Sequence, residues 1–215
     1  MRNQLTLAII ICAALACSCA NPAANKPKAT IANAAPGSDS AKPANAETLV
    51  ISPENSKVEF VAAKVTRSHN GSFKQFAGEI DLVNNDADGS RVSIDIQTNS
   101  VSTDEDDLTK HLQTPDFFDV AKFPKATFTS SKIVAILRTG SSGVHYDVTG
   151  NFELHGIKKS ITFPATITVA PDSVSVNAEF SINRRDFGLV YPGKADDLIR
   201  DGVVIKLTLK VPRAK

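Results

Sequence analysis

The chain has 215 residues, of which 24 are basic and 23 acidic. This near-neutral balance argues against a nucleic-acid-binding protein, which needs a clear excess of positive charge. All three cysteines, Cys12, Cys17 and Cys19, lie within the first twenty residues. The rest of the chain therefore has neither disulfide bonds nor cysteine-ligated metals. We expect one globular domain held together by apolar side chains, which make up 42% of the sequence.

The first sixteen residues have the composition of a secretory signal peptide. Arg2 supplies a positive start, and residues 5–15 form an apolar run that is too short to span a bilayer. Residues 14–17, Ala-Leu-Ala-Cys, resemble a bacterial lipobox, so we expect removal of residues 1–16 and lipidation of Cys17. Two alternatives stay open: cleavage before Cys19, and a plain secretory signal without lipid.

Residues 17–46 are predicted to be a disordered linker that begins with the lipidated cysteine. Between Ala20 and Ala46 there are ten Ala, four Pro and a single large apolar side chain, Ile31. Such a segment cannot fold alone, and a coil of this length would span about 30 Å. Four basic residues and one acidic residue precede residue 47, which leaves 20 basic and 22 acidic residues in the domain. The domain is therefore not drawn to anionic lipid, and an acyl chain would attach it to the membrane.

Residues 47–215 are dominated by alternation of apolar and polar side chains, which is typical of strands that bury one face. The pattern is clearest in seven runs: 58–62, 76–82, 92–96, 146–154, 161–169, 174–182 and 203–211. Turn signals between the runs are Asn70-Gly71, Asp88-Gly89, Ser142-Gly143, Pro171-Asp172 and Asp201-Gly202. The sequence therefore predicts an all-β domain with an antiparallel sheet.

Only residues 104–113 have a helical pattern, with Thr103 as the expected N-cap. One short helix cannot cover seven or eight apolar strand faces, so the sheet must cover itself as a barrel or a sandwich. A barrel of about eight strands is either filled by side chains or holds one elongated apolar ligand. Small residues at inward positions, such as Gly78 and Gly150, fit a cavity, but they also fit a filled core in which they relieve crowding.

Four motifs resemble the YceI-like family and occur in the family's order. Residues 70–78, Asn-Gly-Ser-Phe-Lys-Gln-Phe-Ala-Gly, are similar to its Gly-x-Phe-x-x-Phe-x-Gly hairpin. Residues 111–119, His-Leu-Gln-Thr-Pro-Asp-Phe-Phe-Asp, and the Phe-Pro-x-x-x-Phe run at 123–128 resemble its central helix, loop and strand. A Val-x-Gly strand at 148–159 and an Arg-x-Asp-Phe-Gly segment within 182–188 complete the match.

The resemblance implies an extended, eight-stranded, lipocalin-like antiparallel barrel over residues 47–215, with one short helix. It also implies a cavity that takes a polyisoprenoid or another long amphiphile. The expected ligand-binding residues lie on inward strand faces or near the mouth of the barrel: Phe76, Phe117, Phe118, Phe128, Val148, Gly150, Phe152, Phe163, Phe180 and Arg184.

Three of these residues have a specific expected role at the mouth. Phe117 and Phe118 are candidates for an apolar gate, although such residues are more often plugs of the core. Arg184 is a candidate for binding a phosphate head group, because a guanidinium can hold a phosphate through two bonds. Alternatively, Arg184 pairs with Asp186 or another carboxylate and braces the corner.

No catalytic residue, metal or cofactor is predicted. The four histidines, His69, His111, His145 and His155, do not have the spacings of a zinc site. A nucleophile elbow, a zinc-protease motif and a dinucleotide-binding motif do not occur in the sequence. His111 is expected to be a latch for the Phe117–Phe118 loop or a polar group at the cavity mouth.

The leading hypothesis is a non-enzymatic, membrane-tethered protein that sequesters or carries a polyisoprenoid in the periplasm of a bacterial cell envelope. Ser18 follows Cys17, and the absence of Asp at this position predicts the outer membrane if the cell is Gram-negative. The main alternative is a filled barrel that binds an envelope protein. In that case the resemblance to the YceI-like family indicates the fold but not the function. An enzyme acting on lipid is a weaker alternative.

Overall fold

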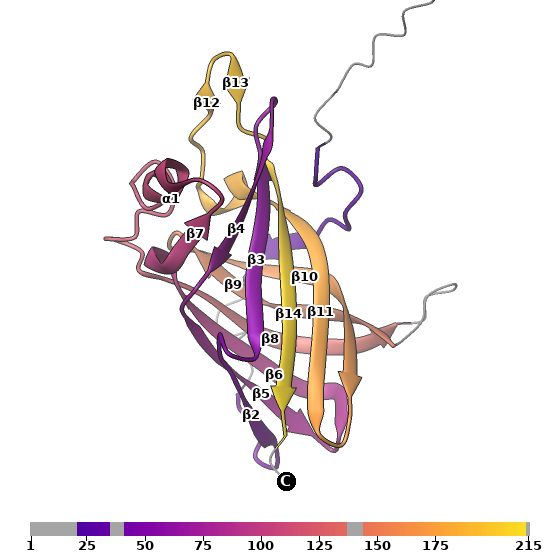
Figure 1. Cartoon of the computed structure of the whole chain (residues 1–215). Helices are drawn as coiled ribbons and strands as arrows, with labels where there is room; N and C mark the ends of the chain where they lie inside the picture. The colour runs from indigo at the N-terminus through magenta and orange to yellow at the C-terminus, as the bar shows by residue number, and fades with distance from the viewer. Residues whose placement is uncertain (1–20, 35–40, 137–143, 214–215) are drawn as a thin grey trace, which may run out of the picture.

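In the computed structural model, which describes residues 21–34, 41–136 and 144–213, one curled antiparallel sheet forms most of the domain (Figure 1). The strands are β1 (Thr30–Asn33), β2 (Glu47–Ile51), β3 (Ser56–Ala63), β4 (Ser68–Phe73), β5 (Phe76–Val83), β6 (Asp86–Gln97), β7 (Val101–Thr103), β8 (Lys125–Ile136), β9 (His145–Leu154), β10 (Ile157–Val169), β11 (Ser173–Asn183) and β14 (Gly202–Pro212). Eleven of them follow the order β2-β5-β6-β8-β9-β10-β11-β14-β3-β4-β7, and β1 pairs with β10.

A few short elements lie beside this sheet. They are the helix α1 (Asp106–Leu112), the 3₁₀ turns η1 (Thr98–Ser100) and η2 (Arg184–Phe187), and a separate ribbon of β12 (Gly193–Lys194) and β13 (Asp197–Leu198). Within the described ranges, no helix is long and apolar enough to cross a membrane. The predicted signal peptide, Cys17 and Cys19 lie outside the described residues.

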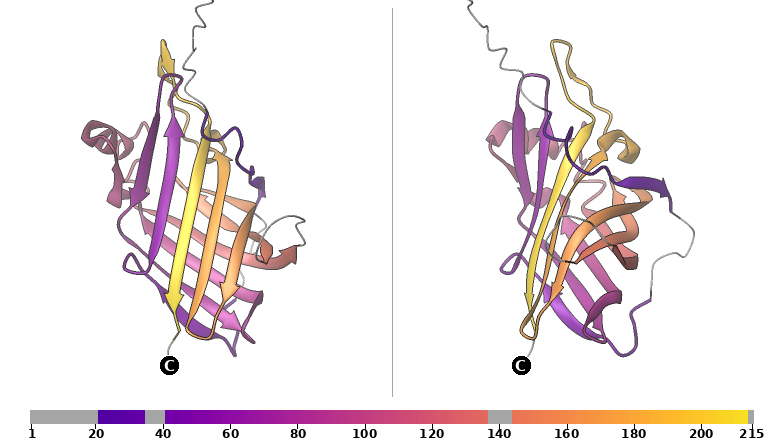
Figure 2. Two further views of the ribbon diagram at one scale, coloured as in Figure 1. Left: turned by 45° about the vertical axis from the view of Figure 1, so that its right-hand side comes forward. Right: turned by 90° about the vertical axis from the view of Figure 1, so that its right-hand side faces the viewer.

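The sheet curls because two long strands are interrupted at the same corner. Lys74 and Gln75 separate β4 from β5, and η1 separates β6 from β7. The Lys74 N–H donates to the Ser100 carbonyl, and the Gln97 N–H donates to the Gln75 carbonyl, each at 3.0 Å. The two chains pair with each other on both sides of the corner, but the outer partner changes, so that β5 lies between β2 and β6 whereas β4 lies between β3 and β7. As a result, β3, β14 and β11 face β5, β6 and β8 across the interior (Figure 2).

The predicted all-β antiparallel fold with one short helix is confirmed, but the predicted count of eight strands is not. The corner divides two long strands into four, and β2 adds a further short strand, which gives the eleven strands of the path. Within the described residues, the end strands β2 and β7 share no ladder. The described residues thus form a large curled sheet, a half-barrel, and its closure into the expected lipocalin-like barrel stays a prediction.

Two of the predicted turns are wrong. Asn70-Gly71 lies inside β4 and Asp88-Gly89 inside β6, whereas the β5–β6 hairpin turns at Asn84 and Asn85 (φ 51° and 57°). A two-residue hairpin turn of type I′ needs two consecutive positive φ angles, which Asn tolerates better than most residues. Gly71 has a different role, because a Cβ there would lie 2.1 Å from the Phe60 ring that covers it.

One end of the sheet, the closed end, is filled by aliphatic side chains and held by Arg213. The side chains buried there include Ile51, Val174, Leu209 and Val211. The Arg213 Nη2 lies 2.6 Å from a Glu47 carboxylate oxygen, and its Nη1 donates to the Ala170 carbonyl at 3.1 Å. The hydrogen bond with Glu47 raises the pKa of Arg213. Arg213 thus joins the end of β14 to β2 and to the β10–β11 turn.

The prediction of a disordered linker over 17–46 is wrong for residues 27–33, which we call the N-terminal strap. The strands β10 and β11 pair only from Thr166–Val169 to Val174–Asn177, and the strap fills the gap where they diverge. There β1 pairs with β10 from Thr30↔Thr162 to Asn33↔Lys159. On the other side, the Ala29 N–H donates to the Ser181 carbonyl and the Ser181 N–H donates to the Pro27 carbonyl, both at 2.8 Å.

The strap also contributes to the core. Ala29 is 4% exposed, and Ile31 packs against the buried cluster. Composition correctly indicates that this segment cannot fold alone. The diverging edges of β10 and β11, however, offer backbone groups that need hydrogen-bond partners, and the strap supplies them.

The buried methyl group of Ala29 gives a test of the strap. Ala29→Asp would place a carboxylate among apolar side chains, and we expect a loss of about 2 kcal/mol or more in the free energy of unfolding. Protection of the Ala29 and Ser181 amides in hydrogen exchange should fall as well. Ala32→Asp, at an exposed position of the same N-terminal strap, is the matched control. Equal effects of the two substitutions would contradict burial of the strap at Ala29.

Candidate functional site

An apolar cavity of about 150 Å³ lies inside the curled sheet. Its wall residues come from β3, β4, β6, β8, β9, β10, β11 and β14: Val58, Phe60, Ala62, Phe73, Ile94, Ile96, Ala126, Phe128, Phe152, Leu154, Ile161, Phe163, Phe180, Ile182, Val203, Ile205 and Leu207. In β14 the lining residues are in the half of the strand nearer Gly202, whereas Leu209 and Val211 fill the closed end. The cavity therefore lies in the half of the sheet remote from the closed end, and we call that end the mouth end.

Aromatic rings form much of the cavity wall. The Phe163 and Phe180 rings are stacked, with centroids 4.2 Å apart and planes at 11°. Phe128 contacts Phe163 at 5.6 Å between centroids. On another part of the wall, Phe73 contacts Phe60 at 5.8 Å and Phe118 at 5.7 Å. These tilted contacts leave a space bounded almost wholly by carbon atoms.

Two separate segments cover the cavity at the mouth end. Leu112, Phe117 and Phe118 come from the end of α1 and the loop after it, and Leu189 and Ile199 come from the segment around β12 and β13. The two segments meet in a cluster of three rings, His111, Phe117 and Tyr191, whose centroids are 5.0–5.3 Å apart.

The ring cluster also involves a polar contact. The Nε2 atom of His111 lies 2.9 Å from a carboxylate oxygen of Asp116. This bond and the edge-on packing of His111 against Phe117 are the contacts that a latch for the Phe117–Phe118 loop requires.

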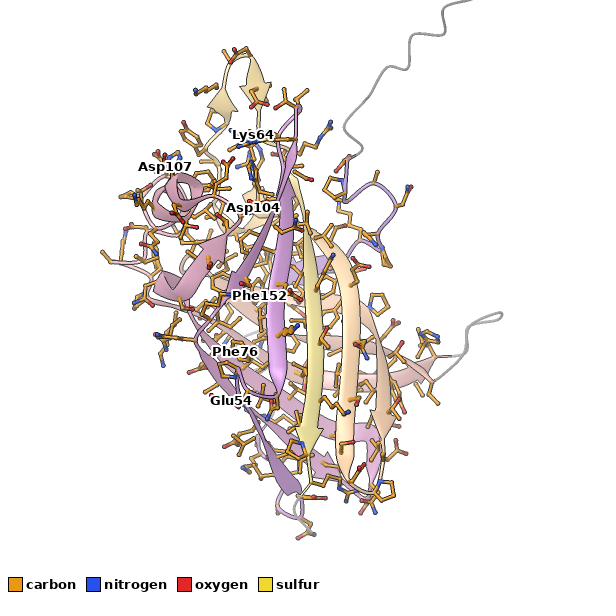
Figure 3. All side chains as sticks on the ribbon, in the orientation of Figure 1. Glu54, Lys64, Phe76, Asp104, Asp107 and Phe152 are labelled. Atoms are coloured by element: carbon orange, nitrogen blue, oxygen red, sulfur yellow. The ribbon has the colours of Figure 1, made fainter. Side chains whose placement is uncertain are left out.

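Seven of the ten residues expected to bind ligand line the cavity: Phe117, Phe118, Phe128, Phe152, Phe163, Phe180 and Arg184. Phe76, Val148 and Gly150 do not line it, and Phe76 lies nearer the closed end than Phe152 (Figure 3). A Cβ at Gly150 would lie 2.5 Å from the Thr129 carbonyl oxygen and 2.6 Å from the Phe128 ring. Gly150 therefore makes room for Phe128, and a larger residue there would displace this ring.

Sequence reasoning missed Leu189 and Ile199 because they lie outside the alternating runs. Leu112 had a weak signal, since it lies on the apolar face of the predicted helix. The helix itself begins two residues later than expected, at Asp106, and its N-cap is Glu105 in place of Thr103.

Arg184 is 3% exposed and braces the corner between η2 and the segment that ends at β14. Its guanidinium donates to the carbonyl oxygens of Leu189, Ile199 and Arg200. Its carboxylate partner is Asp201, at 3.1 Å, and not Asp186. Burial lowers the pKa of Arg184, and the Asp201 carboxylate opposes this effect. These contacts match the alternative in which Arg184 braces the corner. Binding of a phosphate head group by Arg184 stays a prediction, and such a group would compete with these contacts for the guanidinium.

A second polar junction holds the base of the helical loop. The His69 side chain is buried, and its Nδ1 lies 3.0 Å from an Asp104 carboxylate oxygen. The other Asp104 oxygen accepts a hydrogen bond from the Asn70 N–H at 3.1 Å. Burial acts to raise the pKa of Asp104, but the hydrogen bonds from Asn70 and His69 outweigh it, and the pKa is lowered. Asp104 thus ties β4 to the start of the α1 segment.

The contacts of Asp104 predict that part of the free energy of unfolding is lost at acid pH. Because the pKa of folded Asp104 lies below its ordinary value of 3.8, its contribution is complete above pH 3.8 and is lost as the pH falls through the folded value. The side chain is 42% exposed, so we expect Asp104→Asn to cost no more than about 1 kcal/mol at pH 7.

Urea unfolding of wild type and Asp104→Asn at pH 7 and pH 3 measures this effect. The difference between the two proteins should shrink at pH 3. Asp107→Asn is the matched control, because the Asp107 side chain is fully exposed (Figure 3). A difference of the same size at both pH values would contradict the role of the carboxylate.

Comparison with known proteins places this architecture in a family. Residues 49–211 match the YceI-like domain. The chain belongs to the YceI-like family. A UPF0312 protein of Pseudomonas putida (strain W619) is 34% identical over 129 residues, which cover 57% of this chain and 65% of that protein. Protein YceI of Salmonella arizonae is 34% identical over 125 residues, which cover 55% and 62% of the two chains. The matches thus span less than two thirds of these YceI-like relatives.

Solved structures show the same YceI-like fold. A polyisoprenoid-binding domain from Saccharophagus degradans has a TM-score of 0.62 at 19% identity, and the match covers 79% of this chain and all of that one. BcnA of Burkholderia cenocepacia has a TM-score of 0.59 at 25% identity, with 72% and 95% of the two chains covered. The resemblance drawn from the sequence motifs is therefore confirmed. The N-terminal strap lies before the part that matches the YceI-like domain.

Proposed function

We propose that this YceI-like protein binds a polyisoprenoid or a similar long-chain amphiphile in the bacterial cell envelope, without catalysing a reaction. The observation that carries the proposal is the cavity, whose lining is almost wholly carbon and which is covered by two separate lid segments. The fold shared with the polyisoprenoid-binding domain from Saccharophagus degradans supports the same class of ligand.

The size of the cavity indicates how a ligand would enter. A cavity of about 150 Å³ is of the size that holds a benzene ring, so a longer tail requires wall or lid side chains to move. Phe117 and Phe118 are suited to this movement, because they come from a loop and pack by tilted ring contacts. Binding would therefore be coupled to rearrangement of the lid.

The free energy of binding depends on where the tail comes from. Transfer from water gains about 0.8 kcal/mol per methylene, which for a long tail would exceed the practical affinity limit of about 20 kcal/mol. In an envelope, however, the tail is already buried in a bilayer, so its transfer into the cavity is close to neutral. Head-group contacts and proximity to the membrane would then decide occupancy.

Lipid retention tests the proposal. Native mass spectrometry of the protein extracted gently from membranes should show a co-purifying apolar molecule. Ala62→Phe adds a ring at a lining position and should reduce the bound fraction, because the cavity has room for about one such ring. Ala77→Phe makes the same change at an exposed position of β5 and should leave the bound fraction unchanged. Ligand-free protein in every preparation would favour the alternative, an envelope protein that binds other proteins with a filled interior.

We also propose that the lipidated Cys17 anchors the protein on the periplasmic side of a membrane, and that Ser18 directs it to the outer membrane of a Gram-negative cell. Cys17→Ser should then shift the protein from the membrane fraction to the soluble fraction, whereas Cys19→Ser should not. The reverse result would assign the lipid to Cys19. If neither change alters fractionation, the lipoprotein proposal fails.

A further inference from the structure

Three exposed apolar side chains belong to the segments at the mouth end, and we call them the apolar tip. Val65, in the turn between β3 and β4, is 51% exposed, Val190 is 58% exposed and Leu198, in β13, is 49% exposed. The Val65 N–H donates to the Leu198 carbonyl at 3.0 Å, so the two loops are joined. The β3–β4 turn and the β12–β13 ribbon project together beyond the rest of the sheet (Figures 1 and 2).

Two residues of the apolar tip adjoin cavity-lining residues in the sequence. Val190 follows Leu189, and Leu198 precedes Ile199; in each pair one residue is exposed and the other lines the cavity. Single exposed apolar residues are ordinary, but a group of them beside the cover of an apolar cavity is the kind of patch that marks a binding surface.

The N-terminal strap brings the chain to the same end. The strap forms hydrogen bonds with Ser181, which lies near the end of β11, shortly before η2. Ala23 lies against Gly202 at the start of β14. Cys17 is only four residues before Asn21, so an extended chain between them reaches at most about 14 Å. The connection from Cys17 to the domain is thus shorter than the predicted linker span of about 30 Å, and it leads to the mouth end.

We propose that the apolar tip docks on the surface of the bilayer that holds the anchor, and that the lipid passes between bilayer and cavity along the path from Leu198 and Val190 to Ile199 and Leu189. This inference rests on the proposed function and names the surface through which it acts. A bilayer fits the tip because the short connection from a lipidated Cys17 would hold this end against the membrane, and because Val190 and Leu198 adjoin residues that line the carbon-walled cavity.

Tryptophan reporters can locate the tip, because the chain contains no Trp. Leu198→Trp and Val190→Trp each place a single reporter at an exposed position of the tip. The mature, full-length protein would be reconstituted in phosphatidylcholine vesicles made with or without brominated acyl chains. We expect a blue-shifted emission and loss of most of the fluorescence in the brominated vesicles for both tip reporters.

Val50→Trp is the matched control, because Val50 is 64% exposed and lies in β2 at the closed end. Its emission should be the same in both kinds of vesicle. Equal emission in both vesicles for the tip reporters would overturn the proposal, and so would equal quenching at positions 50 and 198. A tip emission that changes with protein concentration but not with vesicles would assign the surface to a second copy of the chain, and would also overturn it.

Native mass spectrometry of the same samples separates this inference from the proposed function. Co-purified lipid together with unquenched tip reporters would reject the docking surface alone. Quenched tip reporters without any bound lipid would support docking of the tip, but would reject the lipid-binding function and the lipid path that rests on it.

Discussion

The two hydrogen bonds at the corner, from Lys74 to Ser100 and from Gln97 to Gln75, allow one sheet to enclose an interior. A sheet of eleven regular strands would expose its apolar face. The β4–β5 and β6–β7 chains are interrupted at the same level and stay paired with each other, but the outer partner of the first chain changes from β3 to β2 across the corner. The enclosed space, its aromatic wall and its two lid segments all depend on this change of partners.

The same need for backbone partners explains the N-terminal strap. Wherever neighbouring strands of a curled sheet diverge, their N–H and C=O groups lose their partners. Between β10 and β11 this gap opens beside Phe163 and Phe180, whose stacked rings line the cavity. The strap closes the gap with backbone hydrogen bonds and with the small side chain of Ala29. An Ala-rich segment is suited to this position because a larger side chain at Ala29 would compete with the core for space.

The sequence predicted the features that depend on local pattern. Phe163 and Phe180 were expected to point inward from the alternation of their strands, and they line the cavity. Features that depend on distant partners could not be predicted. Nothing near Gly150 indicates that the Phe128 ring occupies the space beside it, and nothing near Arg184 indicates that carbonyl groups of residues 189, 199 and 200 surround it. The pairing of the strap with the sheet could not be predicted for the same reason, because its partners are about 130 to 150 residues away in the sequence.

The separation between the strap and its partners also sets an order of folding. During synthesis or export from the N-terminus, residues 27–33 emerge early, but their partners Thr162 and Ser181 follow only after most of the domain. Contacts this far apart form late, because closing so long a loop is entropically costly before other contacts shorten it. The β10–β11 edge thus stays open until the rest of the sheet has formed, so the interior of the sheet is the last part of the domain to be closed on this side.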